Sequence, residues 1–261
     1  MTFQVAGLTL GAALILVTIA FGVACLRRRF DTIDGLWGVG FAAIAVVGWW
    51  VAPVVDAPGA IGALLTVLWG TRLSLHIYQR NRAKPEDERY VAMLRRARRR
   101  PLGRMYFRAY LTQGVVMWFV SAPVQFALHE PATDGMRWLL WPGVLLWTVG
   151  FAFESVGDLQ LRRFARDPAN ANSVLERGLW RYTRHPNYFG DACVWWGLYV
   201  VACTSWPGVA TIASPLLMTW LLARGTGKPM LERDLVRRRP GYADYVARTS
   251  GFVPLPPKRS D

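Results

Sequence analysis

The sequence predicts an all-α polytopic membrane protein with seven transmembrane helices, and two observations lead to that prediction. Hydrophobic residues make up 53% of the 261 residues, and most of them fall in long uninterrupted runs. Such runs are typical of helices that span a bilayer, which need about 20 apolar residues each. The charged residues lie between the runs, and arginine-rich segments alternate with segments that contain neither Lys nor Arg.

Seven apolar runs follow one another along the chain. The first stops at Arg27-Arg28-Arg29, and it is too long, and lacks the preceding basic segment, for a cleavable signal peptide. The second follows Asp31 and Asp34 and is closed by Pro53, and the third follows Ala57-Pro58-Gly59. The predicted helices cover residues 4–26, 35–52, 60–78, 105–128, 137–157, 188–203 and 206–223.

Loop charge predicts the orientation of these helices. The segments after the first, third, fifth and seventh helices are rich in arginine, whereas those after the second, fourth and sixth are not. Because basic loops remain in the cytoplasm, we expect the N-terminus outside and the C-terminus in the cytoplasm. The same rule accounts for the formal charge of +14, so we expect no nucleic-acid partner. The basic segment 80–104 is expected to fix the topology and to contact anionic membrane lipids.

Two kinds of site are not favoured by the sequence. Cys25, Cys193 and Cys203 lie in apolar runs without the spacing of metal ligands, so we interpret them as small buried hydrophobic residues. The glycine-rich motifs of Rossmann and P-loop nucleotide sites do not occur.

Polar residues at the junction of the fifth and sixth helices form the strongest candidate site. Glu154, Asp158 and Arg162 are four residues apart, so they share one face of a helix. Carboxylates at membrane depth usually face the interior of a bundle or a wet cavity. The same spacing recurs at the start of the sixth helix, in Asn187, Asp191 and Trp195.

Basic residues lead into the sixth helix. Arg184-His185-Pro186 places a proline in its first turn, where side chains and free N–H groups favour an anion. Further polar residues come before this motif, among them Arg162, Arg163, Arg166, Asn170, Asn172, Arg177, Arg181 and Tyr182, and Tyr188 follows it. Residues 154–197 therefore predict a site for a buried anionic ligand.

The N-terminal half offers a second group of polar residues. Arg72, His76 and Arg80 share a helical face that begins inside the third predicted span, and arginine within a span usually lines a functional cavity. Asp34 allows two interpretations. It is either an N-cap of the second helix or a carboxylic acid that hydrogen-bonds a substrate carbonyl.

The basic tail from residue 224 onward also allows alternatives. Tyr242 and Tyr245 are placed either to stack on an adenine ring or to anchor the chain at the membrane interface. Glu232 lies among basic residues that include Lys228, and it is either a site residue or their counter-charge.

Several motifs resemble the DUF1295 family, which belongs with the membrane reductases of the steroid 5-alpha-reductase C-terminal superfamily. The most specific is Gly-Leu-Trp-Arg-Tyr-Thr-Arg-His-Pro-Asn-Tyr-Phe-Gly-Asp, from Gly178 to Asp191. Similar segments occur at Asp34–Gly38, Leu68–His76, Glu86–Tyr90 and Pro240–Pro254. The resemblance therefore covers nearly the whole chain.

This resemblance implies an NADPH-dependent reductase formed by a single membrane domain, residues 1–261. Residues 1–128 would face the substrate, and residues 137–261 would bind the cofactor. In relatives, residues matching Asp158, Asn187 and Asp191 contact NADPH. For the phosphates we take Arg162, Arg166 and Arg184, and for the rings Tyr182, Tyr188 and Tyr242. The other candidate cofactor-binding residues are Asn170, Asn172, His185, Trp195, Lys228 and Glu232.

For the substrate half, the resemblance implies hydride transfer to a conjugated C=C of a lipophilic enone, with a steroid as one candidate. Relatives bind its carbonyl with a Gln-Glu pair and assist protonation with a tyrosine. Here Ile33-Asp34 stands at the pair, and the tyrosine position falls at Trp69 or Ile77, beside Tyr78. The candidate catalytic residues are Asp34, Arg72, His76 and Tyr78.

Two other classes of protein remain as alternatives. Membrane methyltransferases that use S-adenosylmethionine also carry an Arg-His-Pro-x-Tyr motif, but they tend to have paired glutamates where this chain has Glu232-Arg233. Arginines near residues 158–166 suit a cofactor with several phosphates better. A non-catalytic lipid-binding protein would not need both Asp158 and Asn187. The expected location is the inner membrane of a bacterium.

Overall fold

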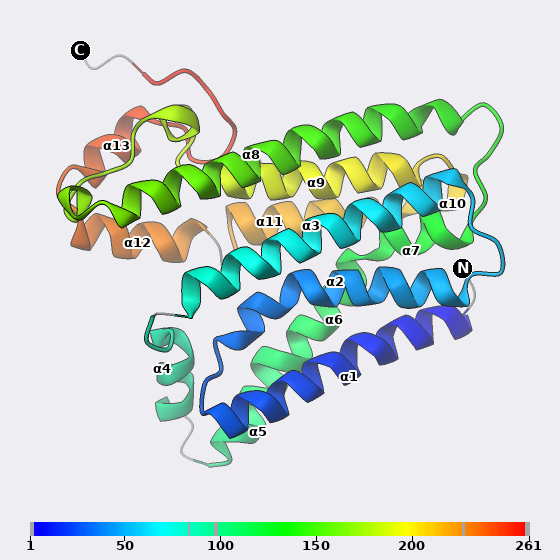
Figure 1. Cartoon of the computed structure of the whole chain (residues 1–261), viewed down its shortest axis with the longest axis horizontal. Coiled ribbons are helices and arrows are strands. Elements are labelled where there is room, and N and C mark those ends of the chain that lie inside the picture. The colour runs from blue at the N-terminus through cyan, green and yellow to red at the C-terminus, as the bar shows by residue number, and fades with distance from the viewer. Residues whose placement is uncertain (1–2, 83, 97–98, 226–227, 259–261) are drawn as a thin grey trace. The chain divides into compact units, whose positions relative to one another are not determined.

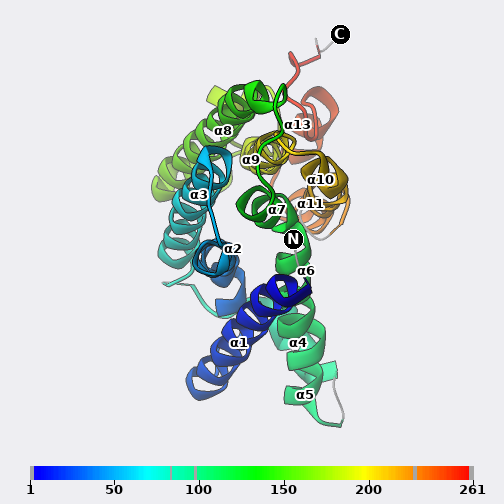
Figure 2. The ribbon, with the colours of Figure 1, turned by 90° about the vertical axis from the view of Figure 1, so that its right-hand side faces the viewer.

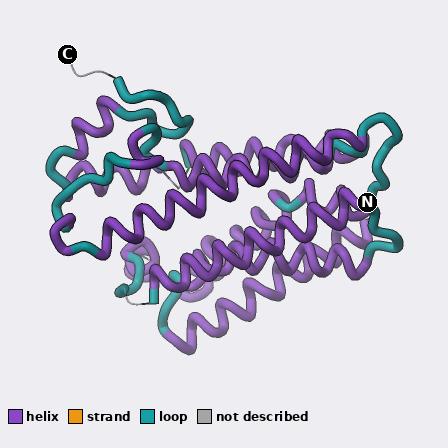
Figure 3. The backbone as a smooth tube through the Cα atoms, turned by 45° about the horizontal axis from the view of Figure 1, so that its top comes forward, coloured by secondary structure: helices purple, strands orange, loops and turns teal. Residues whose placement is uncertain are grey.

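The computed structural model describes residues 3–82, 84–96, 99–225 and 228–258, and these residues contain helices and loops but no strand (Figure 3). The all-α fold class is therefore confirmed. Each of the seven predicted ranges contains helical structure. The chain divides into two compact units. We call them the N-terminal unit (Met1–Leu140 with Val201–Ser214) and the C-terminal unit (Trp141–Val200 with Pro215–Asp261).

Five helices in the described residues are long and apolar enough to cross a membrane. A sixth span results if the bent pair Pro101–Val120 and Ala122–His129 counts as one. This is the pattern of an integral membrane protein. The remaining predicted span, α9 (Pro186–Ala202), is shorter, with 17 residues. The five are Phe3–Arg27, Thr32–Val51, Ala57–Asn81, Arg137–Arg166 and Trp206–Ala223.

In the N-terminal unit, α2 (Thr32–Val51) lies between α1 (Phe3–Arg27) and α3 (Ala57–Asn81), as Figures 1 and 2 show. Glycines bring α2 and α3 into backbone contact. A Cβ atom on Gly38 would lie 2.0 Å from the carbonyl oxygen of Gly70. Close approach through small residues is a common way for helices to pack in membranes, because van der Waals contact replaces the hydrophobic effect there.

The same unit contains shorter helices and one bend. The basic segment forms α4 (Glu88–Arg96) and α5 (Pro101–Met105), and η1 (Tyr106–Leu111) leads into α6 (Thr112–Val120). The axis then bends by 45° into α7 (Ala122–His129). Pro123, in the first turn of α7, explains the bend because it has no N–H to continue the helical bonding.

In the C-terminal unit, the long α8 (Leu140–Arg166) runs beside α9 (Figure 1). Gly150 of α8 and Gly190 of α9 make the contact, since a Cβ atom on Gly150 would lie 2.6 Å from the Gly190 carbonyl oxygen. Gly197, one heptad later on α9, meets the backbone of Trp147 in the same way. Gly197 also meets the carbonyl oxygen of Gly143. Glycines seven apart on each helix, Gly143 and Gly150 on α8 and Gly190 and Gly197 on α9, therefore form a seam along which both backbones approach.

Two features of this unit extend beyond the predicted elements. Helix α8 continues to Arg166, past the predicted end at residue 157. The prediction stopped early because the last turns of the helix are polar, and a search for apolar runs does not include them. The basic tail contains two helices, α12 (Lys228–Arg238) and α13 (Tyr242–Arg248). Short 3-10 turns η3 (Pro168–Asn170) and η4 (Gly178–Arg181) lie between α8 and α9. In the second polypeptide segment of the N-terminal unit, α10 (Trp206–Val209) and η5 (Ala210–Ile212) precede α11 (Ala213–Ala223).

Candidate functional site

Asp158 of α8 and Asn187 of α9 form a buried polar pair in the C-terminal unit. The side-chain amide of Asn187 donates from Nδ2 to Oδ1 of Asp158 over 3.2 Å, and only 6% of Asp158 is exposed. Gly157 makes this possible, since a Cβ atom there would lie 3.3 Å from the backbone nitrogen of Asn187. The structure thus brings together two residues that lie 29 positions apart in the sequence.

Two more carboxylates are buried near this pair. Glu154 lies one turn earlier on α8 and Asp191 one turn later on α9, with 3% and 8% of their surface exposed. The backbone of Glu154 is in contact with Gly190, directly before Asp191. Trp195, the third residue of the repeated spacing on α9, is fully buried. The two predicted polar faces therefore lie inside the unit.

Arg184, just before α9, connects the loop to the tail. Its guanidinium donates to Glu232 of α12, over 2.8 Å from Nε to Oε1 and 3.3 Å from Nη2 to Oε2. The Nη1 group donates to the carbonyl oxygens of Val246 (3.0 Å) and Thr249. Arg184 is 7% exposed. A buried arginine satisfied by this many acceptors holds its partners firmly.

His185 adds a third group to this cluster. Its Nε2 lies 3.0 Å from Oε1 of Glu232, and its ring stacks on Tyr188 at 5.1 Å. Burial lowers the pKa of His185 below its usual 6.5, against the opposing effect of Glu232. Burial by itself would raise the pKa of Glu232, but hydrogen bonds from His185 and Arg184 lower it to about 2. At neutral pH we therefore expect an ionised Glu232 paired with Arg184 and bonded by a neutral His185.

The tail packs onto the loop before α9. The backbone nitrogen of Arg184 donates to Ser250 O (2.9 Å), that of Leu255 donates to Tyr182 O (2.9 Å), and the Thr183 hydroxyl donates to Phe252 O (2.8 Å). Tyr245 is buried, and its hydroxyl donates to Trp180 O over 2.5 Å. These bonds make the loop and the tail one structural element.

The remaining predicted cofactor residues differ in exposure. Tyr242 is 4% exposed and packs edge-on against Tyr245, whereas Tyr182 is 44% exposed. Lys228 reaches Gly251, where a Cβ atom would meet its Nζ. Arg162 is half-buried, and Arg166 and Asn172 are exposed.

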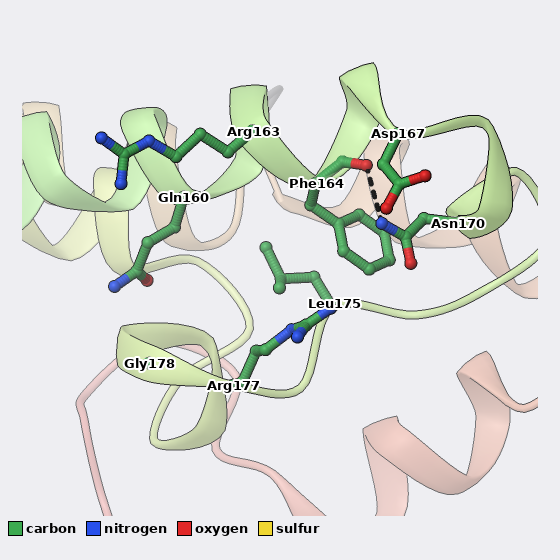
Figure 4. Close-up of a pocket in the computed structure, with 8 residues that line it drawn as sticks. All are labelled: Gln160, Arg163, Phe164, Asp167, Asn170, Leu175, Arg177 and Gly178. Atoms are coloured by element: carbon green, nitrogen blue, oxygen red, sulfur yellow. Dashed lines mark hydrogen bonds between the residues drawn. The ribbon is translucent and has the colours of Figure 1, made fainter.

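A pocket of about 340 Å³ opens at the end of α8 (Figure 4). Gln160, Arg163, Phe164 and Asp167 line it from α8 and the residue after it, and Asn170, Leu175, Arg177 and Gly178 line it from the following loop. Asn170 was a candidate cofactor residue, and Arg163 and Arg177 were among the polar residues of the predicted anion site. A signal for Gln160 and Phe164 was present, because positions 160, 163 and 164 follow helical spacing and share one face of α8.

In the N-terminal unit, Asp34 is the centre of another polar cluster. Its carboxylate accepts from the Tyr90 hydroxyl (2.6 Å) and from Nη2 of Arg89 (2.8 Å). The N-cap interpretation of Asp34 is wrong, because Asp31 occupies that position and Asp34 lies inside α2. Burial, and then the nearby Asp34 charge, raise the pKa of Tyr90. Residues 89 and 90 were not predicted site residues, although they belong to the Glu86–Tyr90 motif.

The other predicted catalytic residues lie on α3. Arg72 and His76 are half-buried, and Tyr78 is 62% exposed. Among the described residues, no group of three or more His, Cys, Asp or Glu side chains is arranged to hold a metal ion.

Comparison with known proteins gives one family and one relative. The family model described as "Protein of unknown function (DUF1295)" matches residues 20–249. The "Uncharacterized protein C594.04c" of Schizosaccharomyces pombe is 23% identical over 280 residues, covering 92% of this chain and 77% of the relative. No solved structure matches the chain.

Proposed function

The chain belongs to the DUF1295 family, and from this premise we propose that it is a membrane-embedded, NADPH-dependent reductase. It would transfer hydride to a conjugated C=C of a lipophilic enone, with a steroid-like 4-ene-3-ketone as the first candidate. The observation that carries the proposal is the buried Asp158–Asn187 pair. Gly157 and the glycine seam let α8 and α9 approach closely enough for these two residues to meet.

The residues around this pair fit a dinucleotide. A carboxylate beside an amide offers both acceptors and donors to the hydroxyl and carboxamide groups of such a cofactor. Arg162 and Arg166 lie one and two turns further along α8 and would bind phosphates. Arg184 is engaged by Glu232 and two carbonyl oxygens. We therefore assign it to positioning the tail rather than to the phosphates.

NADPH would supply the hydride, and the chain would stabilise the charge that develops on the substrate's carbonyl oxygen. We assign that role to the Asp34 cluster, where the Arg89 guanidinium and the Tyr90 hydroxyl both donate to Asp34. When substrate binds, the Tyr90 hydroxyl would turn its single proton from Asp34 to the carbonyl oxygen, beside the charge of Arg89. Tyr90 thus takes the role that the sequence suggested for Tyr78. Oriented donors of this kind often make the largest single contribution to catalysis.

We also propose seven crossings, with the N-terminus outside, in the inner membrane of a bacterium. Support comes from the C-terminal unit, where the loop before α9 and the tail after α11 share hydrogen bonds. Two segments in contact lie on the same side of the membrane, so the chain between them crosses an even number of times. Because Trp206–Ala223 is long enough to cross, α9 would cross as well.

A panel of single variants tests the assignment. Asp158→Ala and Asn187→Ala should each weaken NADPH binding by about tenfold or more, since each leaves its partner without its bond. Tyr90→Phe should keep NADPH affinity and slow enone reduction by about 100-fold, the usual effect of removing one such donor. Isothermal titration and NADPH oxidation in detergent measure the two effects.

Asp134→Ala is the control, because Asp134 is an exposed loop residue and should change neither quantity. Normal NADPH affinity in folded Asp158→Ala and Asn187→Ala variants would remove the basis of the cofactor assignment. A Tyr90→Phe enzyme of full activity would remove the Asp34 cluster from the mechanism.

A further inference from the structure

The pocket at the end of α8 has fixed walls. The backbone nitrogen of Leu179 donates to Oε1 of Gln160 (3.0 Å), which ties the loop to α8. Asn170 Nδ2 donates to the Phe164 carbonyl (3.1 Å), as Figure 4 shows. Arg239, the residue directly after α12, donates to the carbonyl oxygens of Asn170 (3.3 Å) and Ser173. The loop is therefore held at both ends of the pocket, and the pocket is preformed before any ligand binds.

Gly178 lets the loop approach α8. Its φ of +63° is in the left-handed region that favours glycine, and a Cβ atom there would lie 2.4 Å from the Gln160 amide nitrogen. A larger residue would push the loop away and widen the pocket. The shape of this wall therefore depends on a glycine.

Two arginines bring positive charge to the pocket. Arg163 comes from α8 and Arg177 from the loop (Figure 4). Within the described part of the chain neither guanidinium has a hydrogen-bond or ion-pair partner. Other arginines of the same unit do have partners, since Arg184 pairs with Glu232 and Arg248 with Glu176. The pocket thus keeps donors available.

The other lining residues indicate which further chemical groups a ligand of this pocket would carry. Asp167 uses Oδ1 to accept from the nitrogen of Ala169 (3.0 Å), which leaves Oδ2 as an acceptor at the rim. Phe164 and Leu175 give the pocket an apolar wall. The two arginines outweigh the single carboxylate by one charge. An anion that also carries hydroxyl groups matches this combination of donors and acceptors.

Apart from Asn170, this pocket is lined by residues other than those of the proposed cofactor site. Gln160, Arg163 and Phe164 share one face of α8, and Asp167 follows directly after the helix. Asp158 is offset from Gln160 by about 200° of helical rotation. The pocket also lies at the end of the candidate span Arg137–Arg166, where phosphate groups of lipids occur.

We propose that the pocket binds a phosphate ester that carries neighbouring hydroxyl groups. Arg163 and Arg177 bind the phosphate, and Asp167 accepts from a hydroxyl. Its volume of about 340 Å³ suits a group the size of phosphoglycerol, near the lower limit of small-molecule sites. The group comes either from the headgroup of a phospholipid or from a soluble ester.

The test compares the full-length protein with two double variants. Arg163→Gln/Arg177→Gln removes both pocket charges, whereas Arg233→Gln/Arg237→Gln removes two exposed charges of α12 that do not line the pocket. Glycerol 3-phosphate is titrated in detergent by calorimetry. Thermal unfolding is then measured in nanodiscs of phosphatidylcholine with and without phosphatidylglycerol.

We expect one of two results. Either glycerol 3-phosphate binds the wild type and the α12 variant at least tenfold more tightly than the pocket variant, or phosphatidylglycerol stabilises those two proteins and not the pocket variant. The first result identifies a soluble ester and the second a lipid. Equal behaviour of all three proteins in both assays overturns the proposal. A pocket variant that also loses NADPH affinity would assign the pocket to the cofactor site and end its independence.

Discussion

Glu232 is the residue on which the tail and the loop before α9 converge. It accepts from Arg184 and His185, which lie 48 and 47 residues earlier in the chain. Of the two interpretations offered by the sequence, the contacts match the counter-charge, since Glu232 neutralises Arg184. A short motif such as Arg-His-Pro identifies one side of such a cluster. The other side of the cluster, Glu232, is brought there by tertiary packing, which a local sequence pattern does not predict.

The cluster predicts how stability depends on pH. The pKa of Glu232 in the folded protein is about 2, below its usual 4.5, so its contribution to stability is present above pH 4.5 and is lost as the pH falls toward 2. The pKa of His185 is also lowered, from 6.5, so the unfolded chain takes up this proton first. Acid therefore destabilises the fold from about pH 6.5 downward.

Glu232→Gln should lower the free energy of unfolding at pH 7 by about 2 kcal/mol, the usual value for hydrogen bonds to a charged group. The variant should also show a smaller decrease in the free energy of unfolding between pH 4.5 and pH 2. Chemical denaturation at several pH values measures both effects. Glu176→Gln is the matched control, because Glu176 pairs with Arg248 at an exposed position and such pairs contribute little. If both variants behave alike, the Glu232 cluster does not stabilise the fold.

Sequence spacing predicted site residues that are close along the chain and missed those that folding brings together from distant positions. Asp158 and Asn187 were found because each belongs to a repeat of four on its own helix. Tyr90 was missed because its partner Asp34 lies 56 positions away. Arg163 and Arg177 were placed in the predicted anion site without individual roles, because those roles depend on a pocket formed by a loop.

Two sets of loop contacts join segments that the predicted orientation places on the same side of the membrane. In the N-terminal unit, Glu86 accepts from the backbone of Phe30 (2.6 Å) and Arg29 donates to Asn81 O (2.8 Å), which joins the segments after α1 and α3. Asp56 accepts from the nitrogen of Ala132 (2.9 Å), which joins the segments after α2 and α7. The first two segments are basic and the second two lack Lys and Arg up to residue 136.

Cysteine labelling tests the crossing of α9. After replacement of Cys25, Cys193 and Cys203, single cysteines at Asn172 and Arg237 should be labelled from the same side of the membrane. A cysteine at Asp134 should be labelled from the other side. An impermeant maleimide on intact cells and on inverted vesicles distinguishes the sides. Opposite sides for residues 172 and 237 would show that α9 does not cross.

Apolar runs predicted the positions of the long helices because burial in lipid requires such runs. They did not predict the bend near Pro123 or the helices of the tail. The tail helices are too polar to resemble spans, and α12 and α13 depend on the loop that they contact. Hydropathy also gives no reason for α8 to continue to Arg166, where its polar end carries the candidate site.

Polar clusters occur in both compact units. The C-terminal unit holds the Asp158–Asn187 pair, and the N-terminal unit holds the Asp34 cluster. A reductase needs one group of residues for the cofactor and another for the substrate. We assign one cluster to each, and the reductase activity depends first on the claim that the Asp158–Asn187 pair binds NADPH.

The most direct measurement of that claim is ligand-dependent thermal unfolding of the purified protein, with NADPH and S-adenosylmethionine in parallel. A ligand at 100 times its dissociation constant stabilises a protein by about 2.7 kcal/mol. We expect NADPH to raise the unfolding temperature and S-adenosylmethionine to leave it unchanged. Stabilisation by S-adenosylmethionine alone would contradict the account and identify the same residues as the site of a methyltransferase.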